Sequence, residues 1–476
     1  AHSIPFASGL LAEALGEFGN SDMAKELLQG VALPAQLTNG LFPETMAILE
    51  VLRTEENAHI PDYSVEISPA QYISTYRRLK ESTASSPSTR HIGHAKAVLD
   101  DPATVQLYAT MMSVPFFSGY DPLRWKNVVD VMLPKDEGSY YSHRMRIIQI
   151  YEHDFNQSIR EVFARRIGFH LEDNALLPEM QYGSRQGQQC VSAVLNKRLT
   201  YDIAKSAKIV MASLENDAIG CYDQIVLSLG YLMLQKLGIP EAAILAIGKT
   251  WSGMRHYIRT GYGVSQDFYT STIDTPLYGA GQGSTNGPFF WLLMFSIIMK
   301  AMDKTLRGLA FISAFTLQKV ERFGDAFVDD SHFGVTSRHV DDPLLSFEDN
   351  ITQHERQCLE DMLKLGQHYE RLLYSTGGAL NIPKCSWTFI TWRWHHGDAV
   401  MATIAQAPAE LAFTSGHSQT LQRVPRLEAS TGYRTLGCFI SGGGTMTKAK
   451  SILRGHSESH AINIRDANLR PDEAYT

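Results

Sequence analysis

Two adjacent aspartates, Asp329 and Asp330, stand between apolar residues in the stretch ERFGDAFVDDSHFGV (321–335). Apolar residues on both sides of the pair predict the tip of a hairpin that rises from a packed sheet. Two carboxylates so close together repel each other in a low-dielectric setting, so one stays protonated unless a cation neutralises them. A hard divalent metal would do so. A solvated turn, where adjacent aspartates usually occur, is the alternative.

A further carboxylate, Asp217, follows the apolar stretch KIVMASL (208–214), which is typical of a strand. Aspartates that converge from the ends of strands could hold two Mg²⁺ ions about 3.5–4 Å apart, the arrangement that two-metal phosphoryl transfer requires. The spacing alone does not establish convergence. Asp217 could instead cap a helix that begins near residue 218.

The elements that must position these aspartates are a mixture of helices and strands. The periodicity of apolar residues predicts helices at 224–256, 287–302 and 353–375. Alternating patterns around turn residues predict hairpins at 133–150, 325–336 and 385–404, the last with its turn at residues 396–398. We expect a helical extension before residue 80, a Ser/Thr/Pro-rich loop at 81–94 and mainly helices at 95–200. The expected fold class is therefore α+β, with strands brought together from distant parts of the chain.

The composition is that of a globular chain in a reducing compartment. Of 476 residues, 44% are hydrophobic and 20% charged, which argues against disordered and fibrous classes. The apolar run at 288–299 is too short to span a bilayer, so we expect a buried helix there and no membrane partner. Five scattered cysteines without C-x-x-C spacing favour an intracellular location, in the nucleus or the cytoplasm. The chain lacks a secretory signal and begins with Ala1 rather than Met, so we expect a fragment or a processed product.

The charge is unevenly distributed. The net charge of −7 argues against a nucleic-acid partner. Residues 1–70, however, carry ten acidic and two basic residues, so the rest of the chain is close to neutral. A near-neutral body with basic clusters and an acidic centre is compatible with a polymerase.

Seven stretches of the chain carry the aspartates and other candidate residues in a fixed order. The first two are LPKDEGSYYSHRMRII (133–148) and QYGSRQGQ (181–188). They are followed by DAIGCYD (217–223), YGAGQGSTNGP (278–288) and FVDD (327–330), and then by GGALNIPKCS (377–386) and YRTLGCFIS (433–441). Across about residues 85–450 these stretches resemble, in order, the two fingers blocks, the three catalytic blocks and the two later blocks of reverse transcriptases from retrotransposon-type (non-LTR-like) elements.

The resemblance implies catalytic or substrate-selecting roles for five residues of these blocks. Asp217 and Asp329 become the main metal ligands, with Asp330 as a secondary carboxylate. Tyr222 becomes a steric gate under the sugar of the incoming nucleotide, and a buried core ring is the alternative. Lys384 would protonate or stabilise the departing pyrophosphate, or is simply a turn lysine.

The resemblance also implies contacts to the nucleotide and the nucleic acid. Gln282 and Gly283 would contact the nucleotide, although the glycines of this block could merely form the turn before helix 287–302. Lys135 and Arg146 would grip the triphosphate, or are solvated surface charges. Arg185 would touch the template or the nucleotide.

Leu436 and Gly437, in the block that resembles the primer grip, would contact the primer. Two departures from the family pattern, Ser184 and Gly287-Pro288, put template contacts in doubt more than chemistry.

The implied fold is a right-hand polymerase. Residues 1–94 would form a helical acidic extension and linker, 95–207 the fingers, 208–404 the palm, and 405–476 the primer-grip region with an incomplete thumb. The implied activity is that of an RNA-directed DNA polymerase that extends a DNA primer. Its partners would be the primer, an RNA template and dNTP, with two Mg²⁺ ions (or Mn²⁺). A catalytically decayed or domesticated RNA- or protein-binding module is the alternative, and Tyr222 and Val328 disfavour an RNA-dependent RNA polymerase.

Overall fold

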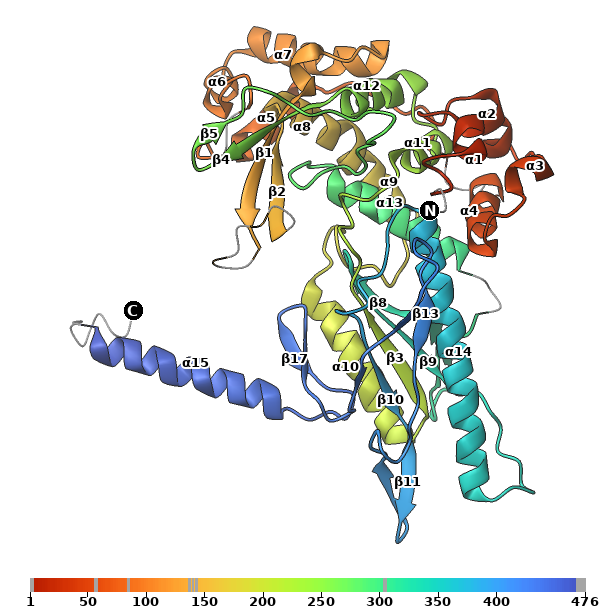
Figure 1. The fold of residues 1–476 in the computed structure, drawn as a ribbon. Coiled ribbons are helices and arrows are strands. Elements are labelled where there is room, and N and C mark those ends of the chain that lie inside the picture. The colour runs from red at the N-terminus through yellow and green to blue at the C-terminus, as the bar shows by residue number, and fades with distance from the viewer. Residues whose placement is uncertain are drawn as a thin grey trace.

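The computed structural model describes residues 4–54, 59–83, 86–135, 138, 141, 144–302 and 306–467. Helices gather around a small sheet at one end of the molecule, and a larger sheet between two long helices forms the other end (Figure 1). Both sheets mix with helices in an α+β architecture, as the sequence predicted.

The predicted helical extension is confirmed. It consists of α1 (Leu10–Leu15), α2 (Asp22–Leu28), α3 (Ala35–Thr38), α4 (Pro43–Thr54) and α5 (Pro69–Arg78). The Ser68 side chain accepts from the Gln71 backbone N–H, and the Gln71 side chain accepts from the Ser68 N–H, which forms a capping box at the start of α5. The predicted helices of 95–200 follow as α6 (Ile92–Ala97), α7 (Pro102–Ser118), η1 (Leu123–Lys126), α8 (His153–Ile159), η3 (Arg160–Arg165), α9 (Arg166–Asp173) and α10 (Cys190–Ala207).

The smaller sheet has the strand order β2-β1-β4-β5. Its strands are β1 (Asn127–Pro134), β2 (Met145–Ile150), β4 (Arg255–Thr260) and β5 (Gly263–Val264). β1 and β2 pair antiparallel, which confirms the first predicted hairpin, although β1 begins earlier than expected. Part of the connection between them, residues 136–137, 139–140 and 142–143, lies outside the described residues. β4 joins β1 in parallel from more than one hundred residues away.

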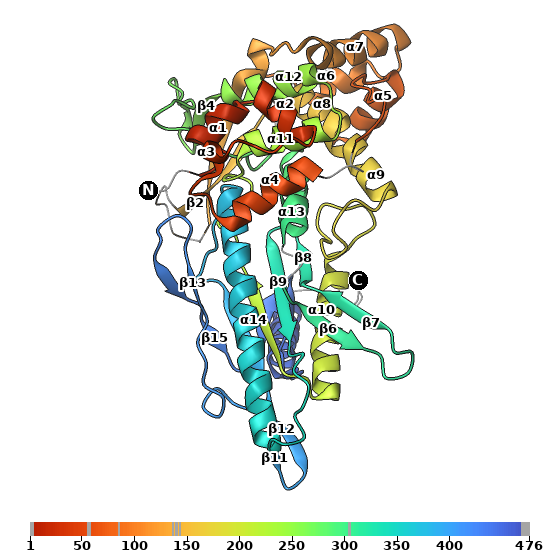
Figure 2. The same cartoon turned by 90° about the vertical axis from the view of Figure 1, so that its right-hand side faces the viewer.

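The larger sheet has the strand order β15-β10-β3-β9-β8. Its strands are β3 (Met211–Asn216), β8 (Gly324–Phe327), β9 (Asp330–Thr336), β10 (Ser386–Ile390) and β15 (Arg426–Leu427). α14 (Phe347–Ser375) covers one face, where Tyr369 packs edge-on against Phe333, with ring centroids 4.6 Å apart. α10 covers the other face, where Tyr201 contacts His332 (Figure 2). β3 and β9 therefore have a helix on each side.

The predicted helix at 224–256 is two helices, α11 (Leu227–Lys236) and α12 (Glu241–Ser252). Gly238 lies between them in the left-handed region, with φ 82, and Pro240 caps α12. Glycine in this conformation ends a helix and proline cannot continue one, so the chain turns here. α13 (Gly287–Ala301) matches its prediction and is buried nearly all round. No helix in the described part of the chain is long and apolar enough to cross a bilayer.

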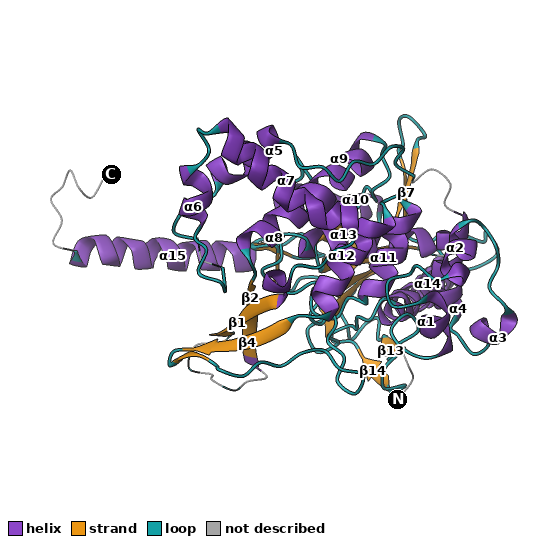
Figure 3. Cartoon of the chain, turned by 90° about the horizontal axis from the view of Figure 1, so that it is seen from above, coloured by secondary structure: helices purple, strands orange, loops and turns teal. Residues whose placement is uncertain are grey.

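The hairpin predicted at 385–404 is only partly confirmed. β10 joins the larger sheet, and the hairpin itself is β11 (Trp392–His395) with β12 (Asp398–Met401). Three further two-stranded pairs are β6 (Leu309–Ile312) with β7 (Lys319–Arg322), β13 (Ala412–Thr414) with β14 (Leu421–Arg423), and β16 (Tyr433–Thr435) with β17 (Cys438–Ile440). The last helix, α15 (Thr447–Asp466), buries none of its residues and extends away from the body (Figure 3).

Candidate functional site

The hairpin β8–β9 carries the two adjacent aspartates at its tip, as predicted. Phe327 pairs with Asp330, so Val328 and Asp329 are the two turn residues. Val328 has φ 60, a left-handed conformation that a β-branched residue rarely adopts. Such strain persists only where surrounding groups fix the backbone.

Two side chains fix this turn. Gln181 accepts from the Val328 N–H at 3.0 Å and donates to the Val328 carbonyl at 3.1 Å. The indole N–H of Trp291 donates to the same carbonyl at 2.6 Å. Gly183 lies so close that a Cβ there would fall 2.2 Å from the Val328 nitrogen. The predicted fingers block at 181–188 therefore packs directly on the aspartate turn.

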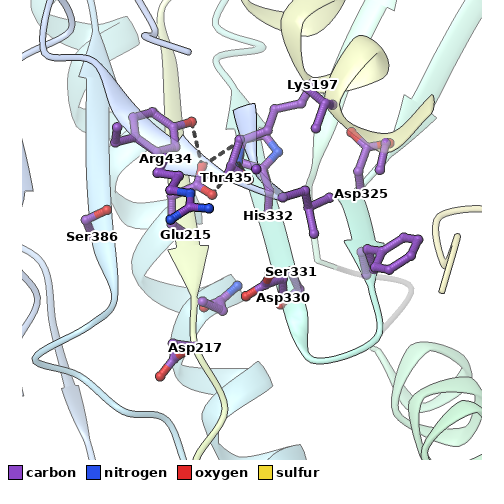
Figure 4. Close-up of a pocket in the computed structure, with 18 of the residues that line it drawn as sticks. Lys197, Glu215, Asp217, Asp325, Asp330, Ser331, His332, Ser386, Arg434 and Thr435 are labelled. Carbon is purple, nitrogen blue, oxygen red and sulfur yellow. Dashed lines mark hydrogen bonds and ion pairs between the residues drawn. The ribbon is translucent and has the colours of Figure 1, made fainter. Parts of the chain in front are cut away.

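Asp217 directly follows β3, the strand that pairs with β9. Asn216, the last residue of β3, pairs with Ser331, which brings Asp217 near the aspartate turn, but Figure 4 shows its carboxylate turned away from Asp330. Asp217 Oδ2 accepts from the Asn381 side chain at 2.8 Å, and the Asp217 carbonyl accepts from the Asn381 N–H at 2.8 Å. No helix begins near residue 218, which rules out the capping alternative for Asp217.

The carboxylates affect one another electrostatically. Burial, followed by the charges of Asp329 and Asp217, raises the pKa of Asp330 to about 6. Burial also raises the pKa of Asp329, and the charge of Asp217 adds to that shift. The charges of Asp329 and Asp330 therefore repel each other, as the sequence led us to expect, and the charge of Asp217 acts on both. A cation at this point would favour their ionised forms.

A cavity of about 500 Å³ lies beside these carboxylates and collects other predicted residues. Asp217, Asp330, Lys384, Leu436 and Gly437 all line it. The last two form the turn between β16 and β17, and both have positive φ, at 46 and 83. This is the backbone pattern of a type I′ hairpin turn. The structure therefore places the block that resembles a primer grip opposite the aspartates.

Tyr222 and Gln282 lie on the adjoining loops. The Tyr222 ring is half-buried, and burial raises its pKa. The Tyr222 carbonyl accepts from the Ala280 N–H at 2.9 Å, and a Cβ on Gly279 would fall 2.3 Å from that oxygen. Gln282 Nε2 donates to Asp223 Oδ2 at 3.0 Å. These contacts bind the tyrosine segment to the glycine block.

The glycines of this block allow close backbone approach to β2. A Cβ on Gly281 would fall 1.6 Å from Gln149 Oε1, and one on Gly283 would fall 2.1 Å from the Gln149 carbonyl. Both glycines have positive φ, at 68 and 125. The Gln149 N–H donates to the Gln282 carbonyl at 2.6 Å. The glycines thus do more than form a turn, because they join the smaller sheet to the loop before α13.

The predicted basic residues occupy two kinds of environment. Lys135 and Arg146 are exposed at the β1–β2 end, and the charge of Lys135 partly offsets the burial that raises the pKa of Asp223. Arg185 instead makes two hydrogen bonds of 2.7 Å to Glu172 and donates to the carbonyls of Pro178 and Gln181. Arg185 therefore stabilises its own loop, and its contact with a template stays a prediction.

Several residues of the site were missed from the sequence. Asn381 holds Asp217, and its place three residues before Lys384 in the N-x-x-K block could have indicated it. Glu215, two residues before Asp217, lines the same cavity. Lys197, buried on α10, forms an ion pair with Glu215. Nothing in the helical pattern around Lys197 indicated that its amine is buried.

The donor set is the oxygen-rich one that Mg²⁺ prefers. Within the described ranges, no three His, Cys, Asp or Glu side chains form a ready-made metal site. Asp217, whose Oδ2 is engaged by Asn381, would have to turn toward the aspartate turn to share an ion.

The α+β fold and the three aspartates near the ends of strands indicate a kind of site, but they do not identify a protein family. A scan against protein-family models finds no match for the chain, and a search of curated proteins finds none either.

Proposed function

We propose that this chain is a template-directed nucleotidyltransferase with a right-hand polymerase architecture. The observation that carries the proposal is that Asp217, which directly follows β3, lies close enough to the tip of the β8–β9 hairpin for its charge to add to the raised pKa of both Asp329 and Asp330, although more than one hundred residues separate them in the chain. Burial, together with the charges of Asp329 and Asp217, raises the pKa of Asp330 to about 6, which supports a site built for cations.

Within that class, the particular activity proposed is that of an RNA-directed DNA polymerase, a reverse transcriptase of the retrotransposon type. Tyr222 supports DNA rather than RNA synthesis, because its ring would leave no room for a 2′-hydroxyl. Asp217, Asp329 and Asp330 would hold two Mg²⁺ or Mn²⁺ ions. These ions would make the primer hydroxyl more acidic and would neutralise phosphate charge.

The remaining residues of the site orient the substrates. Lys135 and Arg146, exposed at the β1–β2 end, would hold the triphosphate of a dNTP. Lys384, exposed in the cavity wall, would give a proton or a positive charge to the departing pyrophosphate. Leu436 and Gly437 would hold the primer end against the carboxylates.

The domain division follows from this function. Residues 95–207, together with β4 and β5, would form fingers, except that α10 packs on the palm. The palm would consist of the larger sheet and α14, which lie within 208–404 apart from β15. Residues 1–94 would be an extension on the fingers side. Residues 405–476 would carry the primer grip and the start of a thumb, with positions 468–476 outside the described residues.

Substitution of the turn aspartate tests the proposal. We expect Asp329→Asn to abolish dNTP incorporation on poly(rA)/oligo(dT) with Mg²⁺ or Mn²⁺, because an amide cannot supply the charge that two cations need. Asp100→Asn, in another adjacent aspartate pair, should leave incorporation at the wild-type rate. Circular dichroism and melting curves would establish that each variant folds.

Primer extension by Asp329→Asn at near the wild-type rate would refute the assignment. A wild-type chain that binds RNA but incorporates no dNTP would instead support the rival function, a non-catalytic RNA-binding module on the same fold.

A further inference from the structure

A buried ionic network connects the β16–β17 hairpin to the larger sheet. Lys197 on α10 is 3% exposed, and its amine forms an ion pair with Glu215 on β3. The same amine donates to Thr435 Oγ1 at 3.3 Å and lies 5.0 Å from the ring centroid of Tyr433. One lysine thus contacts the sheet through Glu215 and the hairpin through two residues of β16; Figure 4 labels Lys197, Glu215 and Thr435.

Hydroxyl groups complete the network. The Tyr433 hydroxyl donates to Glu215 Oε1 at 2.9 Å and lies 3.0 Å from the Tyr201 hydroxyl. The Tyr201 hydroxyl in turn lies 3.0 Å from Ser213 Oγ and 3.4 Å from His332 Nε2. Both oxygens of Glu215 are therefore engaged, as a carboxylate in a largely buried site requires.

The hairpin depends on these side chains for its position. In the described part of the chain, β16 and β17 pair only with each other, and an isolated two-stranded hairpin is marginal in water. α10 also holds the segment that follows, because Arg198 and Lys205 donate to the carbonyls of Gly444 and Gly443 at 3.3 and 3.2 Å.

The geometry relates this network to the chemistry. Glu215 lies on β3 two residues before Asp217, and Leu436-Gly437 follows Tyr433 and Thr435 in the hairpin. Both ends of the network therefore border the cavity beside the carboxylates. A shift of the hairpin would change the distance between its turn and Asp330.

We infer that Lys197, Glu215 and Tyr433 are positioning residues that fix the β16–β17 turn against the aspartates and so place the primer end for extension. The inference rests on the proposed function for its substrate. Its geometric content, that the network sets the position of the hairpin, does not depend on catalysis.

Tyr433→Phe removes the hydroxyl and leaves the ring, so it tests the network with little loss of packing. We expect the KM for primer–template to rise by about tenfold, the size of a lost hydrogen bond to a charged group, while the KM for dNTP stays unchanged. Lys197→Met, which leaves Glu215 without its cation, should show a larger effect, and Lys197→Arg should restore part of the affinity.

Tyr76→Phe is the control, because Tyr76 is a buried tyrosine whose hydroxyl lies 2.9 Å from His153 Nδ1, and it does not line this cavity. It should change neither KM value. Equal rises of both KM values in Tyr433→Phe and Tyr76→Phe would overturn the inference, since they would indicate only a general loss of stability.

A second measurement needs no activity. Cys190 on α10 and Cys438 on β17 are exposed, and the other three cysteines are buried, so spin labels can be attached to these two. We expect a narrow label-to-label distance distribution in the unaltered protein and in Tyr76→Phe, and a broader one in Tyr433→Phe. An unchanged distribution in Tyr433→Phe would overturn the inference. Failure of the unaltered protein to make DNA would refute the proposed function alone.

Discussion

Among single side chains, Tyr222 gives the most specific prediction about substrate choice. Its ring is half-buried beside the glycine block, and its backbone carbonyl is fixed by the Ala280 N–H. Tyr222→Ala should admit ribonucleotides, because removal of the ring opens space for a 2′-hydroxyl. The ratio of kcat/KM for dTTP and UTP on poly(rA)/oligo(dT) measures the change.

The preference for dTTP should fall by at least about tenfold, which corresponds to roughly 1.4 kcal/mol. Tyr222→Phe keeps the ring and serves as the control, with discrimination like that of the unaltered protein. If Tyr222→Ala discriminates as well as Tyr222→Phe, the ring has no gating role.

The residues that sequence predicted best are those whose type is unusual for their place. Asp329 and Asp330 stood out because charges interrupted an apolar hairpin, and Asp217 because it ended an apolar strand. Lys197 gave no such signal, since a lysine in an amphipathic helix is ordinarily solvated. Its burial depends on Glu215 and Thr435, which are distant in sequence, so only the folded chain reveals it.

At the scale of elements, the loop at 181–188 and the hairpin β8–β9 act together. Gly183→Ala would place a Cβ 2.2 Å from the Val328 nitrogen, and a backbone atom cannot move aside as a flexible side chain can. We expect a loss of about 1–3 kcal/mol in unfolding free energy and slower primer extension, because Val328 adjoins Asp329. Urea unfolding and single-turnover extension measure the two effects.

Gly168→Ala is the control, since it lies in α9 with no atom within 4 Å of the added Cβ. Alanine is a better helix former than glycine, so this variant should be at least as stable as the unaltered protein. A Gly183→Ala variant that matches it in stability and rate would show that the loop does not hold the turn.

The sequence predicted which segments form helices and strands better than it predicted which strands pair with one another. The hairpins at 325–336 and 133–150 and the helix at 287–302 follow from alternation and periodicity, which are local properties of the chain. The helical region expected at 224–256 is confirmed as α11 and α12, and the break between them at Gly238 and Pro240 was not predicted. β10 was assigned to a hairpin, whereas its main partner is β3, and such long-range pairing has no local signature.

At the scale of the whole molecule, His153 makes stability depend on pH. Burial lowers the pKa of His153 to about 4; the nearby Asp154 opposes the shift, while Arg90, Arg124 and His94 reinforce it. The unfolded chain binds this proton near pH 6.5 and the folded protein does not, so stability is full above pH 6.5 and falls as the pH drops toward 4.

His153→Gln should remove roughly 1–3 kcal/mol of this pH dependence, because glutamine does not titrate. Urea unfolding at intervals between pH 4 and 7.5 measures it. His456→Gln, at an exposed position on α15, should leave the dependence unchanged. Identical slopes for the two variants would contradict the role assigned to His153.

The order of strands in the larger sheet has a consequence for biosynthesis. β3 lies at the centre of this sheet, yet its neighbours β9 and β10 emerge from the ribosome more than one hundred residues later. The edge strand β15 (Arg426–Leu427) emerges last. Closing loops of this length costs entropy before any strand contact is gained, so pairing between distant strands is slow. The pairing of β3 with β9 aligns the aspartates, so a nascent chain that stops short of β9 carries Asp217 and Asp329 without the sheet that aligns them. The cluster can therefore assemble only after β9 has been synthesised.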